Sequence, residues 1–319
     1  MVQSFTSNWC QTGGFVFCSR ALELDADRRY AASVVRVHSG VTCSNLQINK
    51  TFTGTFDEAW FYLIPLGVEA AGAPAIKALS NAQALISSGG DACLVTREMQ
   101  VVRECIEGMC LVMHRMYEHL DADVFYNLVR PYSGGSKNSS SFPNGIFYEG
   151  VCEVVHVLKQ IDEYVNASAK LPDGRTGTWR MYAGASAGQS PLIHTLDVAL
   201  GIVHHHMPAQ QNVKGPNPMM EMRSYLPIQF QDFITQIGSS CSIQDFAKAN
   251  LETAHVYNQC LLGMKTFRDI HIRMTSVYII AQHRKVRVDG ESAEDVGTGG
   301  TALIPFLKQT RQETITAMI

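Results

Sequence analysis

Apolar residues recur three and four positions apart along most of the chain, the spacing that places them on one face of an α-helix. Alternation of apolar and polar residues, which is typical of half-buried strands, is scarce. The sequence therefore predicts a mainly α protein. Its expected helices are Leu22–Val37, Phe56–Leu79, Glu98–His119, Asp121–Val129 (with Asp121 as N-cap), Leu192–Val203, Asp245–Gln282 and a last one from about residue 302 to the C-terminus.

Segments rich in Ser, Gly, Asn and Pro separate these helices and are expected to be loops. They comprise residues 131–145, 166–178 and the glycine-containing turn 184–188. The polar stretch 283–296 leads into Gly297–Thr301 and is expected to be a mobile loop. Neither glycine segment carries a complete dinucleotide or phosphate-loop motif. Their glycines would instead let the backbone approach a flat ligand or swing over a site.

The composition is that of a chain with a large packed core. Of its 319 residues, 46% are hydrophobic and 17% are charged, and the formal net charge is −3. Without an excess of basic residues, nucleic acid is not an expected partner. Charges and prolines interrupt the apolar helix 56–79, so it is predicted to be a core helix and not a membrane span. The first residues lack the pattern of a signal peptide, and a cytoplasmic location is expected.

Nine scattered cysteines and a run of three histidines are expected to be structural. No two cysteines form a CxxC pair, so reduced and mostly buried thiols are predicted. His204–His206 resembles a metal site at first sight. Consecutive residues on a helix point in different directions, however, and three in a row rarely converge on one ion.

Arg268 and His271 are three residues apart in a predicted helix and therefore share a face. An imidazole can bind a metal, and a guanidinium can hold a carboxylate through two hydrogen bonds. Haem presents both an iron and propionate carboxylates. The alternative is an ordinary buried histidine beside a structural arginine, and the spacing alone does not decide between them.

Arg130 follows two aromatic residues, Phe125 and Tyr126, at the end of a predicted helix. Aromatic rings together with an arginine suit a site that stacks a ring and holds a carboxylate, as an aromatic amino acid requires. An arginine that complements the dipole at a helix end is the alternative.

Several further segments combine with these residues in a fixed order and approximate spacing from about Leu22 to the C-terminus. The most specific are Ser186–Ser190, within Ala183–Ser190, and Gly297–Thr301. Shorter ones are Phe61–Leu63, Val68–Ala71, Ala75–Lys77, Phe125–Arg130, Tyr148–Gly150, Asp197–Val198, Tyr225–Pro227, Arg268 with His271, Tyr278–Ile279 and Phe306–Lys308. In this order the chain resembles the indoleamine 2,3-dioxygenases, haem enzymes that open the indole ring of tryptophan with O2.

The resemblance implies a haem-dependent dioxygenase with haem b as cofactor, and with tryptophan or a close indole derivative and O2 as substrates. It implies that His271 is the axial ligand of the haem iron. Arg268 would hold a propionate, with Asp197 in the same polar network, and Gly184 and Ala185 would lie against the cofactor. The implied product is N-formylkynurenine, formed by cleavage of the indole C2–C3 bond in the kynurenine pathway.

The resemblance also implies a substrate pocket. Arg130 would hold the substrate carboxylate, and Thr298 would lie on a loop that closes over the amino-acid end of the substrate. The residues implied around the indole ring and O2 are Phe125, Tyr126, Tyr30, Ser33, Val34, Phe61, Ser186 and Ala187.

The implied architecture is a large helical-bundle haem domain, residues 56–319, preceded by a much reduced small domain, residues 1–55. Ser33 stands where the family commonly has a cysteine, and Pro65 where it commonly has a serine near bound O2. These departures keep a second hypothesis open, a haem-dependent monooxygenase or rearrangement enzyme acting on a modified indole or another aromatic amino acid in secondary metabolism. A non-catalytic haem-binding sensor and a helical protein without haem are the remaining hypotheses. The oligomeric state is left open.

Overall fold

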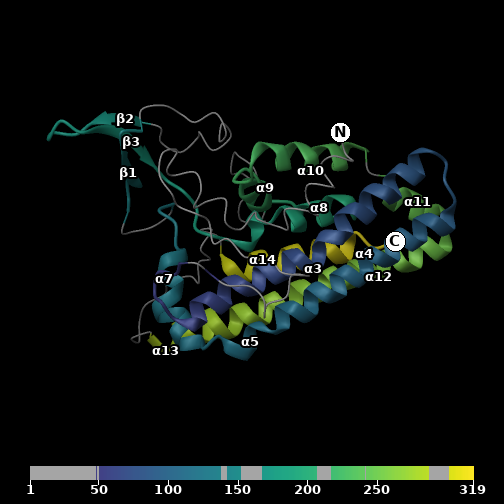
Figure 1. The fold of residues 1–319 in the computed structure, drawn as a ribbon, viewed down its shortest axis with the longest axis horizontal. Coiled ribbons are helices and arrows are strands. Elements are labelled where there is room, and N and C mark those ends of the chain that lie inside the picture. Colours follow the sequence, from purple (N-terminus) through teal and green to yellow (C-terminus); the bar gives the residue numbers. More distant parts are fainter. Residues whose placement is uncertain are drawn as a thin grey trace.

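The computed structural model describes residues 48, 50–137, 142–151, 167–206, 217–240, 242–286 and 302–319. Within these residues helices dominate, and the prediction of a mainly α protein is confirmed (Figure 1). The long helices are α3 Phe56–Ser87, α4 Ala92–His114, α10 Ile228–Ser240, α12 Leu251–Thr275 and α14 Leu303–Thr316. The shorter helices are α5 Met116–His119, α6 Ala122–Val124, α7 Arg130–Ser133, α8 Pro191–Ala199, α9 Pro218–Arg223, α11 Ile243–Ala249 and α13 Ala281–Val286, with a 3-10 turn η4 at Ala187–Gln189.

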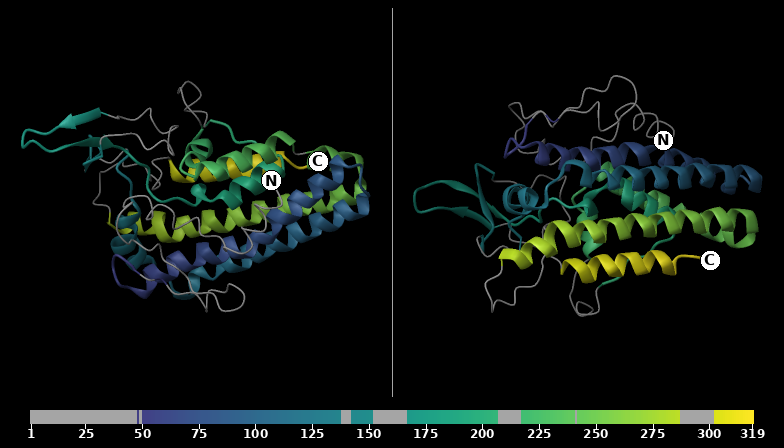
Figure 2. Two further views of the ribbon diagram at one scale, coloured as in Figure 1. Left: turned by 45° about the horizontal axis from the view of Figure 1, so that its top comes forward. Right: turned by 90° about the horizontal axis from the view of Figure 1, so that it is seen from below.

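Helices α3, α4, α12 and α14 form the body of the molecule and run side by side along its length (Figure 2). Their shared core is apolar and fully buried; its largest side chains include Leu79, Met99, Ile106 and Tyr257. Helix α3 approaches its neighbours closely at Gly72, where an added Cβ would lie 2.4 Å from Leu192 Cδ2. A glycine is needed there because no other residue leaves room for that contact.

Helix α3 begins at a well-formed cap. The Thr55 hydroxyl accepts a hydrogen bond from the backbone N–H of Glu58 at 3.2 Å, and the Glu58 carboxylate accepts from the backbone N–H groups of Phe52 and Thr53. The helix continues through Pro65 and Pro74 and ends eight residues beyond the predicted Leu79. It is long and apolar enough to cross a membrane, yet 56% of its most apolar window is buried inside the protein, as in a core helix.

Two π-helical turns lie at one end of the bundle. They are η2, Phe125–Val129, which follows α6, and η6, Ser276–Ile280, which continues α12 into α13. The turns meet through Phe125 and Tyr278, whose ring centroids are 5.8 Å apart, edge to face. Single π turns within α-helices often occur at functional sites, because they re-aim the side chains that follow.

A small antiparallel sheet projects from this same end of the molecule (Figure 1). Its strands are β1 Ile146–Glu149, β2 Ala167–Lys170 and β3 Thr176–Arg180, in the order β1-β3-β2. The prediction of a loop across 166–178 is therefore wrong for 167–170 and 176–178, which are strands, and is confirmed for the connecting turn, residues 171–175. The strands are too short and too rich in Gly, Ser and Thr for their alternation to stand out.

Two predicted helices have different limits in the structure. The predicted helix 245–282 is broken at Asn250, whose extended backbone (φ −133°, ψ 105°) ends α11 and starts α12. The predicted helix 192–203 stops at Ala199, because Gly201 takes a positive φ of 65° that turns the chain away. The predicted N-cap of 121–129 is confirmed, since the Asp121 carboxylate accepts from the N–H groups of Asp123 and Val124.

Candidate functional site

A cavity of about 270 Å³ lies at the end of the bundle where α3 begins and α12 ends. The side chains that line it are mostly apolar, and aromatic residues and methionines are the most frequent among them. The aromatic residues and methionines that line it are Phe61, Tyr62, Met113, Met116, Phe125, Met219, Met222, Met264, Phe267, Met274, Tyr278 and Phe306. Large apolar cavities with a few converging polar groups are the usual form of ligand and cofactor sites.

Most of the predicted site residues meet in this cavity. Those that line it are His271, Arg268, Arg130, Phe125, Phe61, Ala185, Ser186 and Ala187. Gly184 is buried behind the wall, Asp197 is in contact with Arg268, and Tyr126 packs against Arg130. Tyr30, Ser33, Val34 and Thr298 lie outside the residues that the structure describes.

His271 presents a neutral imidazole to the cavity. It lies in the last turns of α12, and burial, together with the positive charge of Arg268, lowers the pKa of His271 to about 4. Among the described residues no side chain or carbonyl forms a hydrogen bond with its ring. An imidazole that is uncharged at neutral pH and free of competing bonds is the form that binds a metal.

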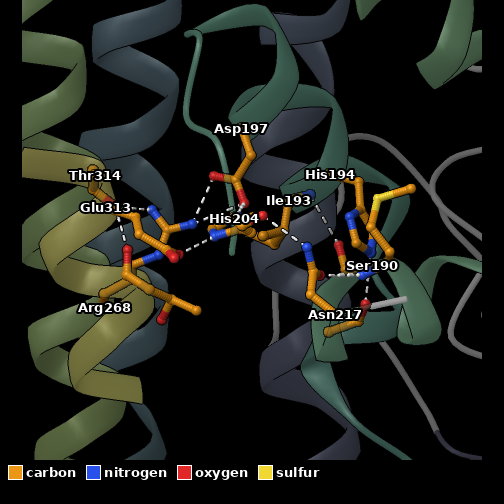
Figure 3. A network of polar contacts seen from close by, with 12 residues as sticks. Ser190, Ile193, His194, Asp197, His204, Asn217, Arg268, Glu313 and Thr314 are labelled. Atoms are coloured by element: carbon orange, nitrogen blue, oxygen red, sulfur yellow. Dashed lines mark hydrogen bonds and ion pairs between the residues drawn. The ribbon is translucent and has the colours of Figure 1, made fainter. Parts of the chain in front are cut away.

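Arg268, one turn before His271, is held rigidly at the cavity wall (Figure 3). Its Nη2 donates to both carboxylate oxygens of Asp197 on α8, at 2.6 and 2.8 Å, and its Nη1 donates to the hydroxyl of Thr314 on α14. Burial alone would raise the pKa of Asp197, but the charge of Arg268 and a hydrogen bond from His204 hold it well below its usual range. The pair thus ties three helices together beside the cavity.

His204 connects the Arg268–Asp197 pair to Glu313, a link that was not predicted from the sequence. Its Nε2 lies 2.9 Å from Asp197 Oδ2, and its Nδ1 lies 2.6 Å from Glu313 Oε2 on α14. Burial alone would lower the pKa of His204, but the hydrogen bonds to Asp197 and Glu313 raise it to about 9. A structural role for the histidine run stays a prediction; within the described segments, no group of three or more His, Cys, Asp or Glu side chains is placed to hold a metal ion.

Arg130 is placed by the first π turn. It follows Val129 at the end of η2, and its guanidinium carbon lies 5.6 Å from the centre of the Tyr126 ring. An arginine over an aromatic face is attracted to the ring quadrupole. The π turn therefore places Phe125 at the cavity surface, and the Tyr126 ring packs against the guanidinium of Arg130.

The glycine-containing loop 184–190 is fastened at several points along the cavity wall. The Ala185 N–H donates to the Ser133 carbonyl, the Ser186 hydroxyl accepts from the Gly188 N–H, and His194 Nε2 donates to the Gly188 carbonyl at 2.7 Å. Its last residue, Ser190, caps α8 and donates to the buried Glu69 carboxyl. Burial raises the pKa of Glu69 to about 7, although the bond from Ser190 opposes this. The loop is thus a fixed wall of the site.

Sequence reasoning missed the methionines of the wall and the contributions of Tyr62, Ser133 and Glu221, which also line the cavity. Glu221 forms a largely buried ion pair with Lys137. The sequence carries a signal for two of these methionines, because Met113 and Met116 are three residues apart and share a helix face. The described cysteines Cys93, Cys105, Cys110 and Cys260 are free thiols, as expected, but the prediction that they are mostly buried is wrong: only Cys260 is buried, Cys105 and Cys110 are half-buried and Cys93 is exposed. Desolvation still raises the pKa of Cys105, Cys110 and Cys260.

Comparison with known proteins identifies the same family that the sequence motifs resemble. The model of the family "Indoleamine 2,3-dioxygenase" matches residues 15–317. Indoleamine 2,3-dioxygenase nanC of Aspergillus nanangensis is 31% identical over 285 residues, covering 86% of this chain and 63% of that protein. Indoleamine 2,3-dioxygenase of Saccharomyces cerevisiae is 30% identical, covering 85% and 61%, and 6-hydroxytryptophan 2,3-dioxygenase fscD of Fusarium equiseti is 27% identical, covering 85% and 64%.

The chain spans less than two thirds of the length of these curated relatives. The similarity nevertheless covers the helices that build the cavity, the glycine-containing loop and the Arg268–His271 face, and the matched region extends over almost the entire chain. This chain therefore belongs to the indoleamine 2,3-dioxygenase family.

Proposed function

We propose that the protein is a haem-dependent dioxygenase that cleaves the C2–C3 bond of the indole ring of L-tryptophan, or of a close indole derivative, with O2. The observation that carries the proposal is the convergence of three groups on one apolar cavity. These are the neutral imidazole of His271, which has no hydrogen-bond partner among the described residues, the fixed guanidinium of Arg268 and the guanidinium of Arg130.

The residues around His271 fit haem b. The imidazole would bind the iron, and Arg268 would hold a propionate through its Nε hydrogen and one Nη1 hydrogen, which form no bond to Asp197 or Thr314. The exposed faces of Ala185 and Ala187, together with the methionines of the wall, suit the flat apolar surface of a porphyrin. When bound, haem would supply the activation of O2, a chemistry that protein side chains lack.

The side chains of the cavity would bind and orient the substrate. Arg130 would hold the carboxylate of the amino acid, and Phe61 and Phe125, whose ring centroids are 4.8 Å apart, would border the indole. Orientation of this kind lowers the barrier because the reacting atoms no longer have to find one another.

The described part of the cavity wall offers no evident general base for the reaction. Within the described part of the cavity wall, the carboxylate of Glu221 is ion-paired with Lys137, and the pKa values of the Tyr62 and Tyr278 hydroxyls are raised by burial. The wall thus keeps its phenols protonated at neutral pH. This arrangement suits direct reaction of the indole with oxygen and does not require removal of the indole N–H proton by a side chain.

A modified indole is the second candidate substrate. One relative bears the name 6-hydroxytryptophan 2,3-dioxygenase, and Pro65 of this chain lines the cavity without a hydroxyl. The haem-dependent insertion of a single oxygen atom into such a substrate is the corresponding alternative reaction. Mass spectrometry of the product formed with ¹⁸O2 separates the two, because ring cleavage leaves two labelled atoms and monooxygenation leaves one.

The direct test is an anaerobic titration of the reduced, haem-loaded protein with L-tryptophan, followed by O2 and identification of the product. Formation of N-formylkynurenine by the wild type, and not by His271→Ala, supports the proposal. A wild-type protein that shows no Soret band after reconstitution with haemin, or that consumes no O2 with any indole amino acid, would contradict it.

A further inference from the structure

His204 lies between two carboxylates, and this position dictates its protonation state. Each ring nitrogen faces a carboxylate oxygen, Asp197 Oδ2 at 2.9 Å and Glu313 Oε2 at 2.6 Å. A neutral imidazole carries only one N–H, so its other nitrogen would turn a lone pair towards an anionic oxygen. Only the imidazolium can donate to both carboxylates at once.

The carboxylates themselves are fixed by other bonds. Asp197 is 1% exposed and also receives both hydrogen bonds from Arg268. Glu313 accepts from the backbone N–H of His205 and from the side chain of Gln309, which keeps it aimed at His204. The His204 carbonyl in turn accepts from the Asn217 side chain at 2.7 Å (Figure 3).

We infer that His204 and Glu313 are positioning residues that set, through Asp197, how much positive charge Arg268 presents to an anionic group in the cavity. The inference rests on the proposed haem site for the identity of that group, a propionate. The protonation state of His204 is inferred from its two carboxylate partners and is independent of the proposed haem site.

The charges of these four residues determine whether each substitution should weaken or strengthen the binding of an anion beside Arg268. Arg268 and His204 contribute two positive charges, and Asp197 and Glu313 contribute two negative ones. Loss of the His204 charge would leave Asp197 and Glu313 to outweigh Arg268, and an anion beside Arg268 would be held less tightly. Loss of the Glu313 charge would leave an excess positive charge, and the same anion would be held more tightly.

The remaining ionisable groups around His204 leave this balance intact. His194 on α8 is a neutral imidazole, because burial lowers its pKa to about 4. His205 lies beside Glu313, with Nδ1 at 3.5 Å from Oε1, and its side chain is largely exposed to solvent. On α12 the facing charge is Arg268, which opposes protonation of His204 but less strongly than the two carboxylates favour it.

The first experiment is an NMR titration of the histidine ring protons in the haem-free protein, residues 1–319. The His204 resonance is identified by its loss in His204→Gln. We expect it to titrate with a pKa of about 9. A His204 resonance that titrates below pH 7 would overturn the inference, whatever the protein binds.

The second experiment compares the affinities of His204→Gln and Glu313→Gln for haemin at pH 6.5, and repeats both measurements with haemin dimethyl ester, which lacks the propionate charges. We expect haemin binding to weaken about tenfold in His204→Gln and to strengthen about threefold in Glu313→Gln. The ester should bind all three proteins with affinities that agree within about twofold. His205→Gln, which alters an exposed imidazole beside the same carboxylate, is the matched control and should change neither affinity.

The opposite changes in haemin affinity expected for the two variants distinguish an effect of charge from a loss of folded structure. If both substitutions weaken haemin and the ester alike, His204 and Glu313 only support the fold, and the inference fails while the proposed haem site stands. If the wild-type protein binds neither ligand, the proposed function fails, and the link from His204 to a propionate fails with it.

Discussion

The two ends of the helical bundle are built by the same helices but have opposite character. In its first half α12 packs tightly, with Tyr257, Cys260 and Leu261 fully buried, and Cys260 lies against the backbone of α4. In its second half the same helix carries Arg268 and His271 and borders the cavity. The change occurs within about two turns of one continuous helix.

The difference lies in which side chains fill the space between the helices. Interdigitating aliphatic and aromatic residues close the packed end, and the Tyr257 hydroxyl is satisfied by the Leu200 carbonyl at 2.6 Å. At the other end the π turns and the loop 184–190 hold the walls apart. Stability and ligand binding should consequently respond to substitutions in different halves of α12.

The largest effect should come from His271→Ala at the cavity end. It removes the imidazole that we expect to bind iron, and haemin affinity should fall by about a hundredfold or more. Haemin titration followed by the Soret band measures this. The melting temperature of the haem-free protein should change little, because the ring makes no hydrogen bond among the described residues; an unchanged Soret titration would show that another residue is the ligand.

The converse substitution, Leu261→Ala, should affect stability and not binding. Leu261 is fully buried in the packed half of α12, and such truncations cost about 2–5 kcal/mol through lost burial and the cavity left behind. Denaturant unfolding of the haem-free protein measures the loss. Haemin affinity should stay within about twofold of the wild type; a large loss of affinity would mean that the two ends are not independent.

Arg130→Ala should raise the Michaelis constant for tryptophan about tenfold or more, because a buried charge-assisted pair with the substrate carboxylate is lost. Tryptamine, which has no carboxylate, should be affected much less. Steady-state kinetics with both substrates provides the measurement, and Arg273→Ala, at an exposed arginine of α12, is the matched control. Equal effects on the two substrates would remove Arg130 from the role of carboxylate ligand.

The smallest predicted effect is a pH dependence of stability caused by His271. Its folded-state pKa of about 4 lies below its ordinary value of 6.5, so the unfolded chain binds more protons between these pH values. The free energy of unfolding should therefore fall as the pH drops from 6.5 to 4. Because the ring borders a cavity that water can enter, we expect a change of only about 1 kcal/mol.

This dependence should be smaller in His271→Ala than in the wild type, and comparison of the two haem-free proteins cancels the contributions of other groups. Unfolding curves at several pH values provide the data. Parallel pH profiles of the two proteins would indicate that the His271 ring is hydrated as in the unfolded chain.

The bundle and its apolar faces were predictable from the sequence, because helical spacing is a local property. The helix break at Asn250 was not, since one residue with an extended backbone leaves the apolar pattern on both sides almost undisturbed. The sheet strands were missed for a related reason: four- and five-residue strands show too few alternations to be distinguished from a loop.

Some features of the candidate site were likewise predictable from local sequence, and others were not. The Arg268–His271 face followed from a spacing of three residues within one helix. The bonds that fix it connect residues far apart in the sequence, as in Arg268 with Asp197 and His204 with Glu313, and no local pattern predicts them. The family resemblance placed Asp197 near Arg268, but His204 and Glu313 became evident only from the packed helices.

The π turn at Ser276–Ile280 has a consequence for how this cavity could change during evolution. A π turn holds one more residue per hydrogen-bonded loop than an α-helical turn. Deleting a single residue there would restore regular α-helix and, because the wider turn accommodates that extra residue, would change the wall mainly at the turn itself while later positions kept approximately their present faces. Tyr278, whose hydroxyl donates to the Leu120 carbonyl, would leave its place beside Phe125. A one-codon deletion could thus reshape the binding site while sparing the packed half of the bundle.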